Sequence, residues 1–202
     1  MRDPFRIAIP ARHASTRFPG KPLVALRGRP MLEHVWRRAL EAGADQVVIA
    51  TDDQRIADAA RDFGAEVCLT RSDHASGTDR LAEVAALLEW GNDDVVVNLQ
   101  GDEPLTPPAI LAQAARDLEH CPQAPMATLA TPMDPAEAED PNVVKVVTDA
   151  GGFALYFSRA PIPWWREGVP AQPDPPFRRH LGIYAYRAGF LDAYTRLSPA
   201  PL

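Results

Sequence analysis

"FRIAIPARHASTRFPGK", residues 5–21, joins an apolar run to a loop that carries three cations. The run from Phe5 to Ile9 predicts a short buried strand. The loop that follows combines cations with rigid turn residues: Arg12, Arg17 and Lys21, punctuated by Pro10, Pro19 and Gly20. In α/β proteins, the loop after the first strand is a usual place for phosphate. We interpret this loop as a phosphate-binding site, with a solvated basic turn as the alternative.

The sequence beyond this loop alternates between short apolar runs and helical patterns up to about residue 121. Strands are expected at 5–9, 45–51, 66–70 and 93–100, and helices at about 31–42, 53–63, 78–90 and 107–120. This alternation predicts an α/β fold with a mostly parallel central sheet flanked by helices. Ligands of such sheets bind at the carboxyl ends of the strands, so the loops that follow the strands should converge on one edge.

Residues 122–202 follow a different pattern, with strand-like stretches and few helices between them. Proline is dense from Pro161 to Pro176, and a helix is expected near 189–196. We interpret this part as mixed or antiparallel strands that extend the same sheet. The whole chain is therefore predicted to be one domain, 1–202.

The composition excludes several classes of protein. The net charge of −6 argues against a nucleic-acid binder. The sequence has no long apolar run, which argues against a membrane partner and a signal peptide. Cys68 and Cys121 are isolated, which fits a reducing cytoplasm.

The stretch "NLQGDEP" ends the predicted strand at 93–100 with two acids, Asp102 and Glu103. A carboxylate at a strand end beside a triphosphate suits Mg²⁺, which takes one or two carboxylates together with phosphate oxygens. Asp102 is the better candidate, because a short side chain next to Gly101 is held more rigidly. The alternative is an acidic turn.

Two further loops should lie at the same edge of the sheet. In "HASGTDR", residues 74–80, Ser76 or Thr78 is a candidate helix cap, and Arg80 is expected to be free to contact a base or a sugar. In "ATDD", Asp52 and Asp53 are interpreted as a helix cap.

Lysine occurs only at Lys21 and Lys145, and the other nineteen cations are arginine. Codon bias is the simpler explanation. A lysine kept in such a chain can also serve as a compact point charge on a phosphate. In the later half, Arg159, His180 and Tyr184 together could bind a polar, anionic acceptor such as a sugar acid.

Blocks along nearly the whole chain, from about Ile7 to Leu202, resemble the family of 3-deoxy-manno-octulosonate cytidylyltransferases, the CMP-Kdo synthetases. The blocks occur in the family's order: "IPARHASTRFPGKPL", "ATDD", "HASGTDRLAEV", "VVNLQGDEPL", "DPNVVKVV", "ALYFSRAPIPW" and "RRHLGIYAYR". The resemblance implies a Rossmann-like nucleotide-diphospho-sugar transferase fold. It also implies CMP transfer from CTP to the sugar acid Kdo in the cytoplasm, for lipopolysaccharide synthesis, with Mg²⁺ as cofactor and a homodimer as the assembly.

The resemblance assigns roles to residues of this chain. Lys21, Asp102 and Arg12 form the implied catalytic set, with Arg12 and Lys21 on the triphosphate and Asp102 on magnesium. Gly77, Thr78 and Arg80 match the cytidine-recognising block. The residues that match contacts to Kdo are Gln100, Arg159, His180 and Tyr184. Residues 1–121 would then be the nucleotide-binding part, and 122–202 the sugar-acid-binding and dimerisation part.

The sequence departs from the family pattern at its end. Family chains continue past "LSPAPL" with a "VDTPEDL"-like stretch that supplies a further acidic sugar contact and a second aspartate for magnesium. A polypeptide ending at Leu202 lacks this family segment, and we expect it to bind metal less well. Two alternatives stay open: a cytidylyltransferase for another sugar acid, such as 8-amino-Kdo or a sialic acid, and a nucleotide-binding module without turnover.

Overall fold

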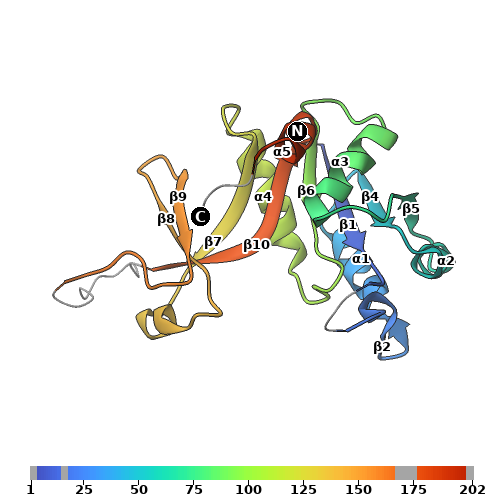
Figure 1. The fold of residues 1–202 in the computed structure, drawn as a ribbon, viewed down its shortest axis with the longest axis horizontal. Coiled ribbons are helices and arrows are strands. Elements are labelled where there is room, and N and C mark those ends of the chain that lie inside the picture. The colour runs from blue at the N-terminus through green and yellow to red at the C-terminus, as the bar shows by residue number, and fades with distance from the viewer. Residues whose placement is uncertain (1–3, 15–17, 167–176, 199–202) are drawn as a thin grey trace. The chain divides into compact units, whose positions relative to one another are not determined.

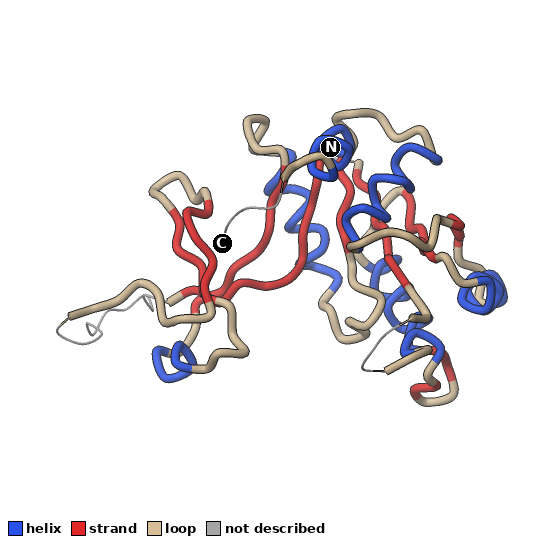
Figure 2. Tube along the Cα trace, in the orientation of Figure 1, coloured by secondary structure: helices blue, strands red, loops and turns tan. Residues whose placement is uncertain are grey.

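The computed structural model describes residues 4–14, 18–166 and 177–198. The chain separates into two compact units: Met1–Ala127 with Ile183–Leu202, and Thr128–Gly182. Figure 2 shows that the helices are concentrated in the first unit, whereas the second is mostly strand and loop. Assigning residues 1–121 and 122–202 to two parts of one domain stays a prediction.

The first unit is built on a sheet whose core strands are parallel (Figure 1). In spatial order the strands are β5 (Glu66–Leu69), β4 (Gln46–Thr51), β1 (Phe5–Ala11) and β6 (Val95–Asn98), followed by β10 (Arg178–Arg187). β10 runs antiparallel to β6, with Tyr184 opposite Asn98. The mostly parallel sheet predicted from the alternating pattern is confirmed.

Helices cover both faces of this sheet. α3 (Gly77–Leu87) and α5 (Ala188–Thr195) pack on one face, where Leu81, Leu191 and Tyr186 share a buried cluster with Ala8 and Val96 of the sheet. α1 (Met31–Glu41) contacts β1 and β4, while α4 (Pro108–Glu119) contacts β6 and α1. α2 (Gln54–Asp62) packs beside β4 and β5. Residues such as Ile7 and Ile49 are fully buried because their strands are covered on both sides.

Short elements follow the basic loop. A 3-10 turn, η1 (Lys21–Leu23), leads into the small hairpin of β2 (Ala25–Leu26) and β3 (Arg29–Pro30). Within the described residues, no helix is both long enough and apolar enough to cross a membrane.

The second unit contains most of β7 (Met126–Pro132), the 3-10 turn η2 (Pro135–Glu139), β8 (Lys145–Thr148) and β9 (Ala154–Ser158). β8 and β9 form an antiparallel hairpin, and β8 also pairs with the start of β10 through Lys145 and Arg179. A small core gathers Met133, Val143 and Phe177, with Trp165 edge-on to the Phe177 ring. The antiparallel strands predicted for this stretch are confirmed, and β10 begins earlier than expected, so that it includes His180. The proline-dense arm lies partly outside the described residues.

Candidate functional site

The carboxyl ends of the parallel strands bring the predicted loops together in the first unit. Gly101, after β6, lies so close to the end of β1 that a Cβ added there would be 2.9 Å from the Pro10 carbonyl oxygen. A Cβ at Gly77, at the start of α3, would be 3.5 Å from the Pro10 side chain. The loops after β1, β5 and β6 therefore meet around Pro10, as the strand pattern predicted.

The basic loop turns back on itself at Gly20. This glycine has a φ of 71° and donates its N–H to the His13 carbonyl oxygen at 3.0 Å. A left-handed φ favours glycine, which has no Cβ to clash. The turn delivers Lys21 at the start of η1. Arg12, the second candidate phosphate-binding cation of this loop, directly follows β1 and is exposed.

Lys21 and Asp102 face each other although they are 81 positions apart in the sequence. The Lys21 ammonium donates to Oδ2 of Asp102 at 2.7 Å, and the side chains are 39% and 49% exposed. An ion pair this exposed contributes about 1 kcal/mol or less to stability, so a ligand can replace it at little cost. The cation and the acid chosen from separate motifs thus lie in one place.

The start of α3 is capped as the sequence indicated. Ser76 accepts the Asp79 N–H at 3.2 Å, and the Asp79 carboxylate accepts the Ser76 N–H at 2.8 Å. This reciprocal pair is a capping box. Ser76 rather than Thr78 is therefore the N-cap, and the Thr78 hydroxyl instead hydrogen-bonds the Tyr186 hydroxyl.

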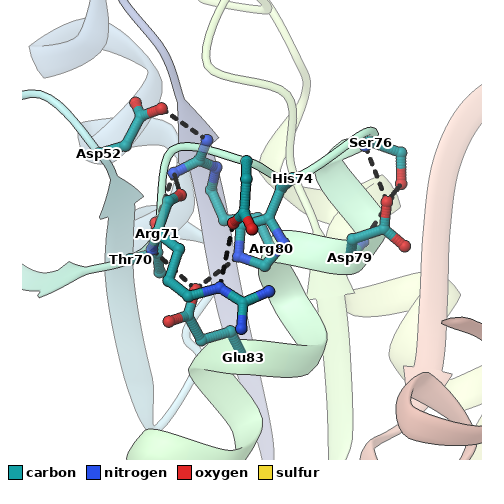
Figure 3. Close-up of polar contacts among 9 residues, drawn as sticks. Asp52, Thr70, Arg71, His74, Ser76, Asp79, Arg80 and Glu83 are labelled. Atoms are coloured by element: carbon teal, nitrogen blue, oxygen red, sulfur yellow. Dashed lines mark hydrogen bonds and ion pairs between the residues drawn. The ribbon is translucent and has the colours of Figure 1, made fainter.

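Arg80 differs from its expected state. Its guanidinium is 5% exposed and donates to Asp52 at 3.1 Å and to the Thr70 hydroxyl (Figure 3). Arg80 is therefore held in place rather than free, because a buried arginine needs acceptors and Asp52 supplies one. It nevertheless lines the cavity described below. The cap assignment is wrong for Asp52 and confirmed for Asp53, which accepts N–H groups at the start of α2. The assignment of Arg80 to nucleotide binding stays a prediction.

A second contact fastens the loop before α3. Glu83 accepts the backbone N–H of Arg71 at 2.9 Å and contacts Nε2 of His74 at 2.5 Å (Figure 3). Burial raises the pKa of Glu83, but these hydrogen bonds outweigh burial and hold its pKa below the usual value. Arg80 and Glu83 together tie residues 70–74 to the first turns of α3. Residues 70–74 are therefore held in place beside the cavity described below.

A cavity of about 130 Å³ opens between these loops. It is lined by several residues that the sequence singled out, together with their neighbours: Pro10, Ala11, Arg12, His74, Ala75, Ser76, Gly77, Arg80 and Gln100. The resemblance assigned Arg12, Gly77, Arg80 and Gln100, from three different motifs, to substrate contacts, and all four line this cavity. Asp102 is two positions beyond Gln100.

Gln100 has a neighbour that the sequence analysis missed. Its amide donates to Oδ1 of Asn98 at 3.3 Å, and Asn98 is buried at the end of β6, opposite Tyr184 in the sheet register. Burial raises the pKa of Tyr184, which keeps its phenol neutral. The sequence feature that could have identified Asn98 is its place as the polar residue that ends the apolar run "VVVN". A buried amide needs hydrogen-bond partners, so such a residue indicates a polar contact nearby.

Arg159 and His180 belong to the second unit. The Arg159 guanidinium donates to the Pro141 carbonyl oxygen at 2.7 Å. Nε2 of His180 lies 2.9 Å from the Thr128 hydroxyl, and its ring meets Phe157 edge-on. Burial lowers the pKa of His180, so the neutral ring is favoured. Gln100 and Tyr184 lie in the first unit, and the grouping of these four residues around one sugar acid stays a prediction.

A parallel sheet whose strand ends present a basic loop, a capped helix and a carboxylate next to a lysine defines a nucleotide-binding α/β protein. Comparison with known proteins narrows the class. A family model described as cytidylyltransferase matches residues 7–202. This chain belongs to the cytidylyltransferase family.

Curated relatives cover nearly the whole chain. The 3-deoxy-manno-octulosonate cytidylyltransferase of Thioalkalivibrio sulfidiphilus (strain HL-EbGR7) is 59% identical, over 98% of this chain and 81% of the relative. The protein of the same name from Vibrio cholerae serotype O1 (strain M66-2) is 54% identical, over 98% and 80%. A solved structure of CMP:2-keto-3-deoxy-manno-octonic acid synthetase complexed with CTP has a TM-score of 0.89 and 43% identity, over 98% of this chain and 80% of that chain. These findings confirm the family resemblance and the fold.

Proposed function

We propose that this protein transfers CMP from CTP to 3-deoxy-D-manno-octulosonate (Kdo), releasing pyrophosphate and CMP-Kdo for lipopolysaccharide synthesis in the cytoplasm. The observation that carries the proposal is the contact of Lys21 with Asp102 at 2.7 Å, beside a cavity lined by the candidate nucleotide residues. Relatives named for this reaction support it at 53–59% identity.

The proposed chemistry is an in-line displacement, in which the anomeric hydroxyl of Kdo attacks the α-phosphorus of CTP and pyrophosphate leaves. Catalysis of this kind depends mostly on positioning and on stabilising charge. Lys21 and Arg12 would neutralise charge that builds on the departing pyrophosphate. Arginine can hold two phosphate oxygens through its planar fork, while lysine acts as a point charge.

Asp102 fits the role of a magnesium ligand. Its carboxylate is half-exposed and its contact with Lys21 is an exposed ion pair, so a cation can take that place. Within the described residues, no three His, Cys, Asp or Glu side chains are grouped to hold a metal without help. A single carboxylate is sufficient when substrate phosphates complete the shell. When bound, Mg²⁺ would neutralise phosphate charge and polarise the reacting phosphoryl group.

We further propose a homodimer as the assembly. The hairpin strand β9 exposes apolar side chains in a row: Leu155 is 67% exposed, Tyr156 50% and Phe157 39%. Because side chains alternate along a strand, Leu155 and Phe157 share one face and Tyr156 lies on the other. Exposed apolar side chains on such a strand are typical of protein interfaces. Light scattering coupled to size-exclusion chromatography should give twice the chain mass, and a monomer mass at assay concentration would contradict the dimer.

A pyrophosphate-release assay tests the proposed reaction. The protein is incubated with CTP and Mg²⁺, and the acceptor is varied between Kdo, 8-amino-Kdo and a sialic acid. Release with Kdo at the highest kcat/KM supports the proposal, whereas preference for another acid replaces Kdo as the substrate. Binding of CTP in calorimetry without pyrophosphate release from any acceptor would instead show a nucleotide-binding module.

A further inference from the structure

Lys145, the second of the two lysines, is fully buried at the start of β8. Its ammonium donates to three backbone carbonyl oxygens: Asp140 at 3.1 Å, Val143 at 2.8 Å and Arg159. An ammonium has three N–H donors, so each donor has one acceptor. The ammonium is therefore fully used inside the protein and has no N–H left for a ligand.

Burying a cation costs free energy unless its environment compensates the charge. No carboxylate contact with Lys145 is found among the described residues. Oδ1 of the neighbouring Asp140 instead accepts the backbone N–H of Asn142 at 2.8 Å and the Asn142 side-chain amide at 3.0 Å. Among the described residues, backbone carbonyl dipoles hold the cation. A fully buried lysine is rare and suggests a specific role at this position.

The three carbonyls come from two segments that are distant in sequence. Two belong to the turn at 140–143, and the third belongs to Arg159, just after β9. Arg159 itself returns a contact to the same turn, because its guanidinium donates to the Pro141 carbonyl oxygen at 2.7 Å. Lys145 fixes the Arg159 backbone, and the Pro141 carbonyl fixes the direction of its side chain.

We propose that Lys145 is a positioning residue that holds Arg159 ready to bind the carboxylate of the sugar-acid substrate. The inference rests on the proposed function, in which Arg159 contacts that acid. The contact with Pro141 uses one N–H of the Arg159 guanidinium and leaves other donors of its planar fork for a carboxylate. A preorganised fork binds with less loss of side-chain entropy than a mobile one. Loss of the contacts that Lys145 makes should therefore weaken binding of the sugar acid and leave binding of the nucleotide unchanged.

The test is steady-state kinetics of Lys145→Met, with CTP and Kdo varied separately in the pyrophosphate-release assay. We expect the KM for Kdo to rise about tenfold, the size of a lost hydrogen bond to a charged group. The KM for CTP should stay within about twofold, because that substrate would not depend on Arg159. An equal rise in both, or no rise in the KM for Kdo, would overturn the proposal.

Two controls separate placement from stability. Val146→Ala truncates a buried side chain on the same strand and keeps the three carbonyls that bind Lys145. It should lower thermal stability and leave both KM values unchanged. Lys145→Met combined with Arg159→Ala should raise the KM for Kdo no more than Arg159→Ala alone, because Lys145 is proposed to act through Arg159. Additive effects in this pair would contradict the inference.

Lys145→Gln provides the test if the methionine variant does not fold, because its amide retains N–H donors for the carbonyls. It should raise the KM for Kdo by less than Lys145→Met. Loss of folding in both variants would overturn the proposal in favour of a purely structural lysine. Absence of turnover with Kdo in the unaltered protein would instead refute the proposed function, and the two failures are thus distinguishable.

Discussion

The two lysines of this chain lie in opposite surroundings. Lys21, at the end of the basic loop in the first unit, is half-exposed and contacts the exposed carboxylate of Asp102. Lys145, in the second unit, is fully buried and donates only to backbone carbonyls among its described contacts. The first cation can exchange its partner for a phosphate, whereas removal of the second takes the donor from the Val143 and Arg159 carbonyl oxygens. The surroundings, not the residue type, decide which cation can serve chemistry and which serves structure.

Asp102→Asn should give the largest effect on turnover, and it is the strongest test of the exposed Lys21–Asp102 pair. Turnover should fall by roughly a thousandfold, about 4 kcal/mol of transition-state stabilisation, because the amide is a poor magnesium ligand. Glu103→Gln, the neighbouring acid, is the matched control and should remain active. Near-normal pyrophosphate release by Asp102→Asn would remove Asp102 from the metal role.

Lys21→Ala should lower turnover by about 2 to 4 kcal/mol, the cost of losing one charge-stabilising donor. The free energy of unfolding should change by less than about 1 kcal/mol, since the ion pair is exposed. The measurements are kcat in the pyrophosphate assay and urea unfolding. An unchanged rate would return Lys21 to the codon-bias explanation.

Lys145→Met should show the reverse profile in the unfolding measurement. It removes the donor of the buried Val143 carbonyl and of the part-buried Arg159 carbonyl, while the Asp140 carbonyl keeps the Val143 N–H. We expect a loss of about 2 to 3 kcal/mol in the free energy of unfolding. Lys21→Met is the matched substitution and should unfold like the unaltered protein. If both methionine variants unfold alike, the contrast between the two surroundings does not hold.

The smallest effect concerns His180 in the second unit. Burial lowers the pKa of His180 from 6.5, so the unfolded chain binds a proton at this position more readily than the folded protein. Stability from this residue is therefore present above pH 6.5 and is lost as the pH falls toward the lower folded pKa. His180→Gln should show a smaller drop in the free energy of unfolding between about pH 7.5 and about pH 5.5 than the unaltered protein. An equal drop in both would show that other groups account for the pH dependence.

Local patterns were sufficient to predict the main strands and helices of the first unit. The apolar run at Phe5–Ile9 and the helical spacing at 31–42 depend on neighbouring residues, and the structure confirms both. Ser76 was a candidate cap because capping is also local. Convergence of the loops followed from the rule that strand ends share an edge, and the contact of Lys21 with Asp102 is its result.

Contacts between distant segments were not predictable in this way. Arg80 and Asp52 are 28 positions apart, and nothing in either motif indicated that the arginine would be buried against that acid. The cage around Lys145 needs the turn at 140–143 and the residue after β9, which only the hairpin register brings together. The course of β10 was not predictable either, because this strand contributes residues to both units.

The capping box of α3 sets a direction for any nucleotide that enters the cavity. The Asp79 carboxylate, held by the Ser76 N–H, already places a negative charge at the start of that helix. In the proposed function, a polyphosphate tail would be repelled by this carboxylate and attracted to Arg12, which lines the cavity, and to Lys21. The electrically neutral pyrimidine would thus face Gly77. In the reverse orientation, the phosphates would be repelled by the Asp79 carboxylate and would lose their contacts with Arg12 and Lys21.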